Sequence, residues 1–394
     1  MSPDHKTRRT FAIISHPDAG KTTLTEQLLK ASGAIQLAGQ VRARGERRRT
    51  QSDWMEIEQK RGISVTSSVM TFERDGLTFN LLDTPGHSDF SEDTYRTLTA
   101  VDAAIMVIDA ARGIEQQTLK LFEICRLRNI PIITFVNKVD REGRDPLEIL
   151  DEVAETLALD VTPVNWPVGM GVTLKHTLDL ITGRAWNADG SAADLSVEEI
   201  RTKAEAGDYL DAEYMQAFEN LDMARAMLPA FDLEAYRAGH LTPVFFGSAI
   251  RGLSVLDLLD AVARWAPSPG AQPADPEAIQ PDAKEVTGFV FKVQANMDKN
   301  HRDRVAFVRI CSGTFQRGMK LRNVKQKKDI TIASPMFFFA RERETADEAV
   351  AGDVVGIPNH GTLSVGDTLT EGTQIQVTGI PDFAPEIIRR VMLR

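Results

Sequence analysis

The sequence predicts an α/β domain with a mostly parallel sheet, helices on both faces and an inserted subdomain, followed by a small antiparallel β-barrel domain. Three observations support this fold class. Up to about residue 265, short apolar runs alternate with longer helical patterns, as in a parallel sheet covered on both faces. Residues 266–284 are rich in proline, as domain linkers often are. Residues 285–378 change to short alternating segments separated by Gly and Asn turns, which is typical of a small barrel.

The elements of the first domain follow from its uninterrupted apolar runs and from the helical patterns between them. The apolar runs are rich in Val, Ile, Leu and Phe, so we expect them to be buried strands. The expected strands are Phe11–Ile14, Leu77–Asp83, Ala103–Asp109, Pro131–Asn137 and Pro243–Gly247. The expected helices are Lys21–Ala31, Ser91–Val101, Glu115–Asn129 and Leu147–Leu157.

A stretch from about residue 160 to 241 interrupts this alternation and predicts a subdomain inserted before the last strand of the sheet. It contains a strand-like piece, Asn165–Val172, and a charged helical piece, Val197–Leu221. The expected organisation is a first domain at 1–265 with that insertion, a linker at 266–284, a barrel at 285–378, and the start of a truncated C-terminal domain at 379–394.

Composition limits the classes of function. A chain of 394 residues with 42% hydrophobic and 26% charged residues is ordinary for a globular protein of two or three domains. The net charge of −10 argues against a general nucleic-acid binder, which needs a basic field. Cys125 and Cys311 have no metal-ligand spacing, so we expect small buried hydrophobes in a reducing compartment. Neither a signal peptide nor a membrane span is visible, which favours a cytoplasmic protein without a membrane partner.

The segment SHPDAGKTT, residues 15–23, follows the first expected strand and has the composition of a phosphate-binding loop. Such a loop aims backbone N–H groups and the positive end of a helix dipole at phosphate. Gly20 would let the backbone approach the phosphates, Lys21 would reach the β- and γ-phosphates, and the Thr22 hydroxyl would bind Mg²⁺. Ser15 stands where the strict pattern has Gly, so a chance strand–turn–helix is the alternative. The candidate nucleotide-binding residues are Asp18, Ala19, Gly20, Lys21, Thr22 and Thr23.

The segment LLDTPGH, residues 81–87, ends the next expected strand. Asp83, at the carboxyl end of a strand, can hold Mg²⁺ through a water molecule opposite Thr22. Gly86 offers an N–H to the γ-phosphate, and His87 is the candidate catalytic residue, positioned to orient the attacking water. The alternative is a simple turn with a structural histidine, but the phosphate loop upstream favours a nucleotide site.

Two further motifs predict recognition of guanine. Asp140 in FVNKVD can accept hydrogen bonds from guanine N1 and N2, a donor pair that adenine lacks, so it discriminates against adenine. Asn137 would bond the base or tether the neighbouring loops, and the Lys138 stem would lie along the ring. Ser248 and Ala249 in FFGSAI offer backbone groups to guanine O6. Each motif alone is weak. All four follow expected parallel strands, however, and ligands bind at that edge of an open α/β sheet, so together they predict a GTP/GDP site.

Residues 42–68 lie between the first two motifs and carry a local basic run. A solvated loop and a contact to RNA phosphate are both compatible with it. Ser64, after Arg-Gly-Ile, is the candidate for a second hydroxyl on the metal, with Thr66 as the alternative. Bound γ-phosphate and Mg²⁺ would then order this segment. The basic run comprises Arg42, Arg44, Arg47, Arg48 and Arg49.

The segments SHPDAGKTT, SDWMEIEQKRGISVTSS, LLDTPGHSDF, FVNKVD and GSAI together resemble the ribosome-dependent translational GTPases. Within them, Pro17, Ser64 and residues 92–126 are most similar to the bacterial class II peptide chain release factors, the release factor three family. The resemblance covers nearly the whole chain, because a P-loop GTPase domain, an inserted subdomain and a β-barrel follow in family order. Elongation-type relatives have Thr where this chain has Ser64, and the family continues into another domain beyond Arg394.

At the matching positions the resemblance implies specific roles. It assigns phosphates and metal to Lys21 and Thr22, the γ-phosphate switch to Asp83 and Gly86, hydrolysis to His87, and guanine to Asn137, Lys138 and Asp140.

The resemblance also implies a function in translation termination, in which GTP is used to remove class I release factors from the ribosome. Hydrolysis would be slow until a ribosomal surface positions His87, and γ-phosphate would reorient the barrel against the GTPase domain. The implied partners are both ribosomal subunits with their RNA, class I release factors and guanine nucleotides, with guanosine tetraphosphate an open alternative; the chain is expected to be a monomer. An elongation-factor G-like translocase or ribosome-protection GTPase stays open, as does a GTP-gated ribosome-binding module that needs no hydrolysis. Asp140 disfavours an ATP-dependent kinase.

Overall fold

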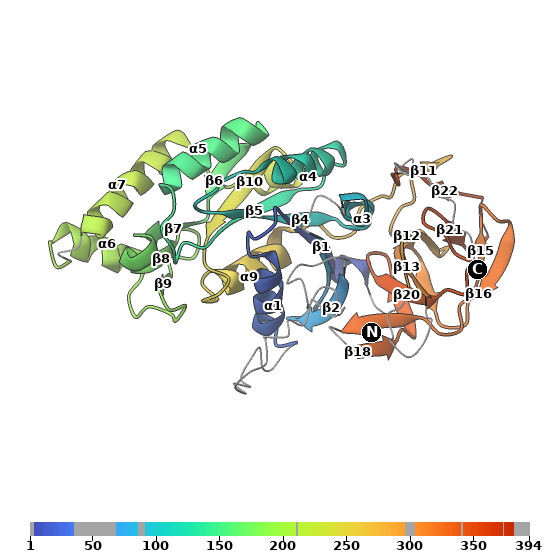
Figure 1. Cartoon of the computed structure of the whole chain (residues 1–394). Helices are drawn as coiled ribbons and strands as arrows, with labels where there is room; N and C mark the ends of the chain where they lie inside the picture. Colours follow the sequence, from blue (N-terminus) through green and yellow to red (C-terminus); the bar gives the residue numbers. More distant parts are fainter. Residues whose placement is uncertain are drawn as a thin grey trace, which may run out of the picture.

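A computed structural model shows an α/β domain beside an antiparallel β domain (Figure 1). It describes residues 4–34, 68–85, 91–209, 212–295, 304–339, 342–372 and 374–381. The predicted fold class is confirmed, because the first part of the chain forms a mostly parallel sheet covered by helices and the later part forms antiparallel strands.

The main sheet of the described residues has the strand order β2-β3-β1-β4-β5-β10-β6. All neighbours pair in parallel except β2, an antiparallel edge strand. The carboxyl ends of β3, β1, β4, β5 and β10 therefore meet at one edge of the sheet. The strands are β1 (Arg8–Ser15), β2 (Ser68–Arg74), β3 (Leu77–Asp83), β4 (Ala103–Asp109), β5 (Ile132–Asn137), β6 (Asp160–Pro163) and β10 (Leu241–Phe246).

Helices cover both faces of this sheet because its strands are apolar on both sides. Along β1, Phe11 and Ile13 face the core that contains α1 (Lys21–Ala31) and α9 (Val255–Trp265). Ala12 and Ile14 face the opposite core, which contains α4 (Gln116–Leu127) and α5 (Pro146–Leu157). These four side chains are fully buried. Burial of a large apolar side chain contributes about 1.5–3 kcal/mol, so the two cores fix strand and helix positions together.

The inserted part of the chain lies at the end of the molecule opposite the barrel (Figure 1). A small antiparallel sheet of β7, β8 and β9 packs beside helices α6 and α7. The charged helical piece expected over Val197–Leu221 forms two helices, and Gly207 between them has φ +78°. Such a left-handed residue ends a helix. The elements are β7 (Asn165–Val168), β8 (His176–Asp179), β9 (Ala185–Asn187), α6 (Val197–Glu205), α7 (Ala212–Met227) and α8 (Leu233–Arg237).

The second domain is antiparallel throughout its described strands. Its main sheet has the order β16-β15-β21-β12-β13-β20-β17-β18, and β14 pairs separately with β19. The proline-rich segment before it is tied to the domain, since β11 (Ala274–Asp275) pairs with β22 (Gln376–Val377). The other strands are β12 (Thr287–Ala295), β13 (Arg304–Ser312), β14 (Thr314–Gln316), β15 (Lys320–Asn323), β16 (Lys328–Thr331), β17 (Met336–Phe339), β18 (Glu342–Thr345), β19 (Glu348–Val350), β20 (Val354–Pro358) and β21 (Thr368–Thr370).

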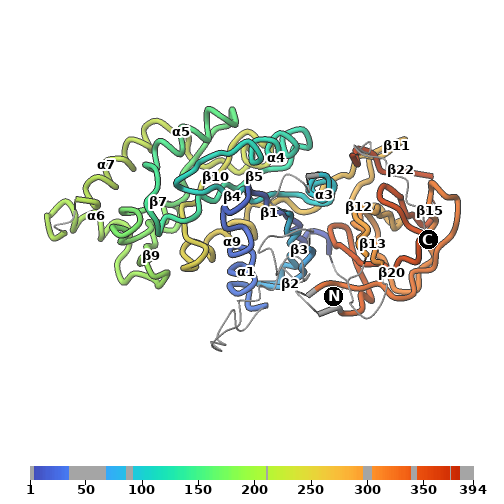
Figure 2. Tube along the Cα trace, viewed as in Figure 1, coloured from blue at the N-terminus to red at the C-terminus, as the bar shows by residue number. Residues whose placement is uncertain are grey.

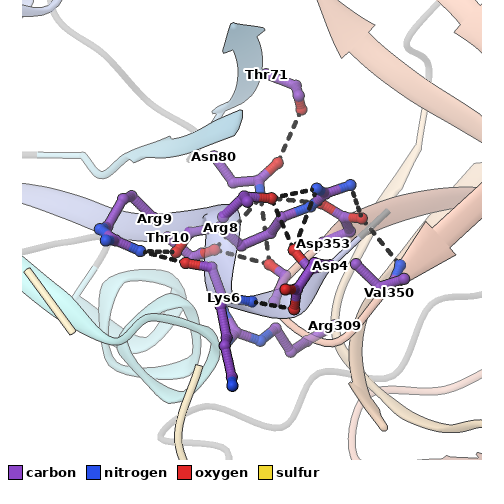
Figure 3. A network of polar contacts seen from close by, with 12 residues as sticks. Asp4, Lys6, Arg8, Arg9, Thr10, Thr71, Asn80, Arg309, Val350 and Asp353 are labelled. Carbon is purple, nitrogen blue, oxygen red and sulfur yellow. Dashed lines mark hydrogen bonds and ion pairs between the residues drawn. The ribbon is translucent and has the colours of Figure 1, made fainter. Parts of the chain in front are cut away.

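The two domains meet along the β2–β3 side of the parallel sheet (Figure 2), where β2 packs against β17. Asp353 is the centre of a buried polar network there (Figure 3) and is fully buried. Its two carboxylate oxygens accept from Arg8 at 3.0 and 3.2 Å, and Val350 N–H donates to it at 2.9 Å. Thr10 Oγ1 donates to the Gly352 carbonyl at 2.7 Å, so the first strand of the sheet is bonded directly to the barrel.

A second set of cations from the barrel holds the segment that follows residue 90. Lys292 on β12 pairs with Asp93 at 3.0 Å, in helix α3 (Ser91–Thr97). Arg309 on β13 donates to the Ala100 carbonyl at 2.8 Å and pairs with Asp102 at 2.7 Å. Both cations are nearly buried, so these contacts exclude water and fix the end of α3 against the barrel.

Most expected elements of the first domain have the observed type, but the helix expected before β4 and the edge of the sheet at β2 differ. The expected helix Ser91–Val101 is α3 followed by a separate 3₁₀ turn at Leu98–Ala100. Strand β2 has no counterpart among the expected elements. Both cysteines are buried, as expected, and burial raises the pKa of each thiol to about 12. Among the described residues, none of the helices has both the length and the apolar surface needed to cross a membrane.

Candidate functional site

Four loops that the sequence singles out lie at the carboxyl edge of the main sheet. They follow β1, β3, β5 and β10, and only β4 separates the first pair from the second. In an open α/β sheet this edge is where ligands bind. The structure therefore brings together Asp18, Ala19, Gly20, Lys21, Thr22, Thr23, Asp83, Asn137, Lys138, Asp140, Ser248 and Ala249.

Some expected site residues lie outside the described residues. These are Gly86 and His87 after β3, Ser64 and its alternative Thr66, and the arginines between residues 42 and 49. Their roles stay predictions.

The phosphate loop depends on a glycine at residue 20. Gly20 has φ +94° and caps α1, which begins at Lys21. A Cβ atom at this position would lie 2.3 Å from Asn137 Nδ2, so the loop needs both the left-handed backbone and the missing side chain. Helix N–H groups at this end have no partners within the helix and carry the positive end of its dipole. The loop thus has the geometry of an anion-binding site.

Lys21 and Asp83 form a buried ion pair beneath this loop. Their exposed fractions are 6% and 2%, and Lys21 Nζ contacts Asp83 Oδ1. Thr25 Oγ1 also donates to Asp83, at 3.3 Å. A buried carboxylate at a strand end and hydroxyls on the first turn of α1 are hard oxygen donors of the kind that Mg²⁺ prefers. The residues present therefore fit a nucleotide with its metal, with the Lys21 ammonium already held at the phosphate end.

Asn137 fastens three loops to one another. Its Nδ2 donates to the Ala19 carbonyl at 2.7 Å, which ties the end of β5 to the phosphate loop. Its Oδ1 accepts from Lys138 N–H at 2.9 Å and from Ala249 N–H at 2.8 Å. Of the two alternatives for Asn137, bonding the base or tethering loops, the structure shows the tether. Ala249 N–H and Ser248 N–H, which bonds the Leu253 carbonyl at 3.2 Å, both have acceptors within the protein.

Asp140 lies at the base end of the same edge. Its side chain is 12% exposed, and Arg251 Nε is 4.0 Å from its carboxylate. Lys138, two residues before it, has φ +73°, and its Nζ donates to the Asp18 carbonyl at 2.5 Å. The lysine stem therefore spans from the base end to the phosphate loop. A carboxylate in this nearly closed position can pair with two adjacent N–H donors of a ligand.

Two residues at the site have no role in the motif analysis. Asp109 ends β4, between the phosphate strand and the base strand, and pairs with Lys138 Nζ at 2.7 Å. Its place at the end of an expected strand was a signal that could have found it. His16, inside the phosphate-loop segment, is buried, with Nδ1 3.4 Å from Thr118 Oγ1 and Nε2 3.6 Å from Glu115. No local sequence pattern predicts these contacts of His16, because Thr118 and Glu115 belong to the start of α4.

His16 is expected to make stability depend on pH. Burial lowers the pKa of His16, although the Glu115 carboxylate opposes this effect. The folded pKa then lies below the unfolded value of about 6.5, so the unfolded state binds the proton first. Stability from neutral His16 is present above that pH and is lost as pH falls toward the folded pKa. Urea unfolding between pH 7.5 and 5 should show a shallower loss in His16→Asn than in the original chain; parallel slopes would contradict this.

The Elongation factor Tu GTP binding domain model matches residues 6–268, and the Elongation factor G domain 2 model matches residues 285–372. A peptide chain release factor 3 from Nitrosomonas europaea is 53% identical over 398 residues, which cover 99% of this chain and 74% of that relative. The chain belongs to the peptide chain release factor 3 family.

Membership of the release factor 3 family makes the chain a translational GTPase that binds guanine nucleotide. A crystal structure of a protein from Thermus thermophilus is similar over 95% of this chain, with a TM-score of 0.73 and 25% identity. The chain spans 56% of the length of that protein. The matches to an elongation factor Tu GTP-binding domain and to elongation factor G domain 2 agree with the two kinds of sheet.

Proposed function

We propose that this chain is a ribosome-dependent GTPase of translation termination, which promotes dissociation and recycling of class I release factors. The observation that carries the proposal is the 53% identity to a peptide chain release factor 3 along 99% of the chain. The proposal adds both ribosomal subunits with their RNA and class I release factors as partners, in the cytoplasm, with the chain acting as a monomer. Guanosine tetraphosphate is a further nucleotide that the same site would accept.

The nucleotide would bind along the edge formed by the four loops. In this proposal residues 18–23 surround the phosphates, Asn137 keeps the loops in place, and Lys138 and Asp140 recognise guanine. A contact from the backbone of Ser248 and Ala249 to guanine would require their N–H groups to leave the Leu253 carbonyl and Asn137 Oδ1. Mg²⁺ would supply charge neutralisation at the phosphates, held by Thr22, Ser64 and, through water, Asp83. The Lys21–Asp83 contact supports this arrangement, because it places cation and carboxylate where phosphate and metal would meet.

His87 would orient the water that attacks the γ-phosphate, and Gly86 N–H would sense that phosphate. Both belong to the segment directly before α3, which the barrel grips through Lys292 and Arg309. A conformational change at residues 86–90 would therefore alter the contacts between the α3 segment and the barrel. We assign residues 1–265 to the GTPase domain with an insertion at about 160–241, 266–284 to the linker, 285–378 to the barrel, and 379–394 to the start of a C-terminal domain.

A change of base specificity from guanine to xanthine tests the proposal with an alteration to this protein alone. Asp140→Asn replaces one acceptor oxygen by a donor, so guanine loses a partner for its N1 and N2 donors, while xanthine, with a C2 carbonyl, gains one. Guanine affinity is expected to fall by about 10³-fold or more, as when a buried polar pair is mismatched. Labelled class I factor on post-release ribosomes should dissociate faster when the original chain is added with GTP. With the Asp140→Asn variant, it should dissociate faster only when XTP is added.

Two outcomes would contradict different parts of the proposal, namely the assignment of Asp140 to the guanine site and the function in termination. Unchanged GTP dependence of Asp140→Asn would remove Asp140 from the guanine site. Normal GTP binding and hydrolysis without faster factor release would remove the termination function. Movement of messenger RNA in the same ribosomes would then support the elongation-factor G-like alternative, which the domain 2 match favours. Factor release that persists in His87→Ala without hydrolysis would support the GTP-gated binding module.

A further inference from the structure

Asp109 connects the phosphate half and the base half of the nucleotide site. It lies at the carboxyl end of β4, the strand between β1 and β5. One carboxylate oxygen, Oδ2, accepts from Lys138 Nζ at 2.7 Å. The other, Oδ1, accepts from Ala111 N–H at 2.8 Å and so fixes the turn after the strand. Both oxygens therefore have separate partners, and the one facing the site is used by Lys138.

Lys138 is held at both ends by unlike constraints. Its backbone has φ +73°, a conformation that residues other than glycine adopt rarely, and Asn137 Oδ1 accepts from its N–H at 2.9 Å. Its ammonium bonds Asp109 and also the Asp18 carbonyl at 2.5 Å. Asp18 itself has φ +64° and belongs to the phosphate loop. Asp109 thus fixes the ammonium at a point from which it also holds the phosphate loop.

The Asp109–Lys138 ion pair is sufficiently shielded from solvent to contribute to the stability of the site. The Asp109 side chain is 9% exposed and that of Lys138 is 23% exposed, unlike the fully solvated pairs that contribute little. Burial alone would raise the pKa of Asp109, but hydrogen bonds from Lys138 and Ala111 bring it below its ordinary value. The carboxylate is therefore charged at neutral pH, and a charge-assisted hydrogen bond of this kind is about twice as strong as a neutral one.

We propose that Asp109 is a positioning residue for guanine-nucleotide binding. It holds Lys138 in the extended arrangement that spans phosphate loop and base, and so slows dissociation of the bound nucleotide. This rests on the nucleotide site proposed above. A lysine stem without the Asp109 contact would sample other rotamers, and each departure would release the Asp18 carbonyl and uncover the face on which the base lies.

Asp109→Asn provides the test, because the amide keeps an acceptor for Ala111 N–H while presenting an uncharged group, or a donor, to Lys138. Dissociation of a fluorescent GDP analogue is measured by competition with excess GDP in stopped flow. Asp109→Asn is expected to dissociate about tenfold faster than the original chain, the change that loss of one hydrogen bond to a charged group gives. Asp151→Asn, on the exposed face of α5, is the matched control and should dissociate at the original rate.

A double-mutant cycle separates positioning from a general structural effect. Asp109→Asn in a Lys138→Met background should add little, because the partner through which Asp109 acts is gone. An equal tenfold effect in both backgrounds would show that Asp109 acts through the Ala111 turn, and would overturn the proposal. Unchanged dissociation in Asp109→Asn would overturn it as well. Failure of the original chain to bind the GDP analogue would instead reject the nucleotide site itself.

Discussion

Gly20→Ala is expected to lower guanine-nucleotide affinity about 100-fold. A methyl group there would lie 2.3 Å from Asn137 Nδ2, and the backbone would keep an unfavourable φ of +94°. Relief of the clash requires Asn137 to release the Ala19 carbonyl, which it bonds at 2.7 Å. The tether between phosphate loop and base loops would then be lost. Isothermal titration calorimetry with GDP measures the affinity directly.

Gly33→Ala is the matched control for that substitution. Gly33 follows the end of α1 and also has positive φ, +79°, but a Cβ atom there would have no atom within 4 Å. Backbone strain alone should lower the free energy of unfolding by about 1 kcal/mol without changing GDP affinity. Equal losses of affinity in both variants would show that α1 stability, rather than the Gly20–Asn137 contact, controls nucleotide binding.

Asp353→Ala is expected to lower the free energy of unfolding by about 3–5 kcal/mol, the largest effect on stability. Asp353 is fully buried, and its removal leaves the Arg8 guanidinium facing a dry interface without its carboxylate. Val350 N–H would lose its acceptor at the same time. The network joins the two domains, and cooperativity between domains depends on their interface. When urea unfolding of Asp353→Ala is followed by one probe in each domain, the two unfolding transitions should therefore no longer coincide.

Asp347→Ala is the control for a carboxylate that is paired but solvated. Asp347 contacts Arg317 at 3.2 Å, with side chains 80% and 52% exposed. Exposed pairs contribute about 0–1 kcal/mol, so unfolding should barely change. Comparable losses in both variants would contradict the buried-network account of the interface in Figure 3.

Local pattern predicted the elements whose residues are apolar without interruption. Strands β3 and β4 have the expected bounds, because buried central strands need apolar side chains on both faces. Strand β2 is an edge strand whose existence depends on pairing with β3, and its sequence SVMTFER carries no regular alternation. The helical piece expected over Val197–Leu221 divides at Gly207, a boundary that its charged, helix-forming composition does not mark.

At the site, motif spacing predicted which loops meet but not how they are fastened. Phosphate and base motifs follow strands, and parallel strands end at a common edge, so their proximity follows from the fold. The role of Asp109 was not predicted, because its partner Lys138 follows the neighbouring strand and a single aspartate at a strand end belongs to no motif. His16 escaped for a similar reason, since its neighbours belong to α4.

The position of β10 has a consequence for the order in which the chain folds during synthesis. β10 lies between β5 and β6 in the sheet but follows both in the chain, after the whole inserted subdomain. A nascent chain that stops before residue 241 therefore leaves the facing edges of β5 and β6 unpaired. The Ala249 amide that bonds Asn137 arrives even later. The base half of the pocket is consequently completed late, and until then a growing chain carries open strand edges of the kind that aggregate.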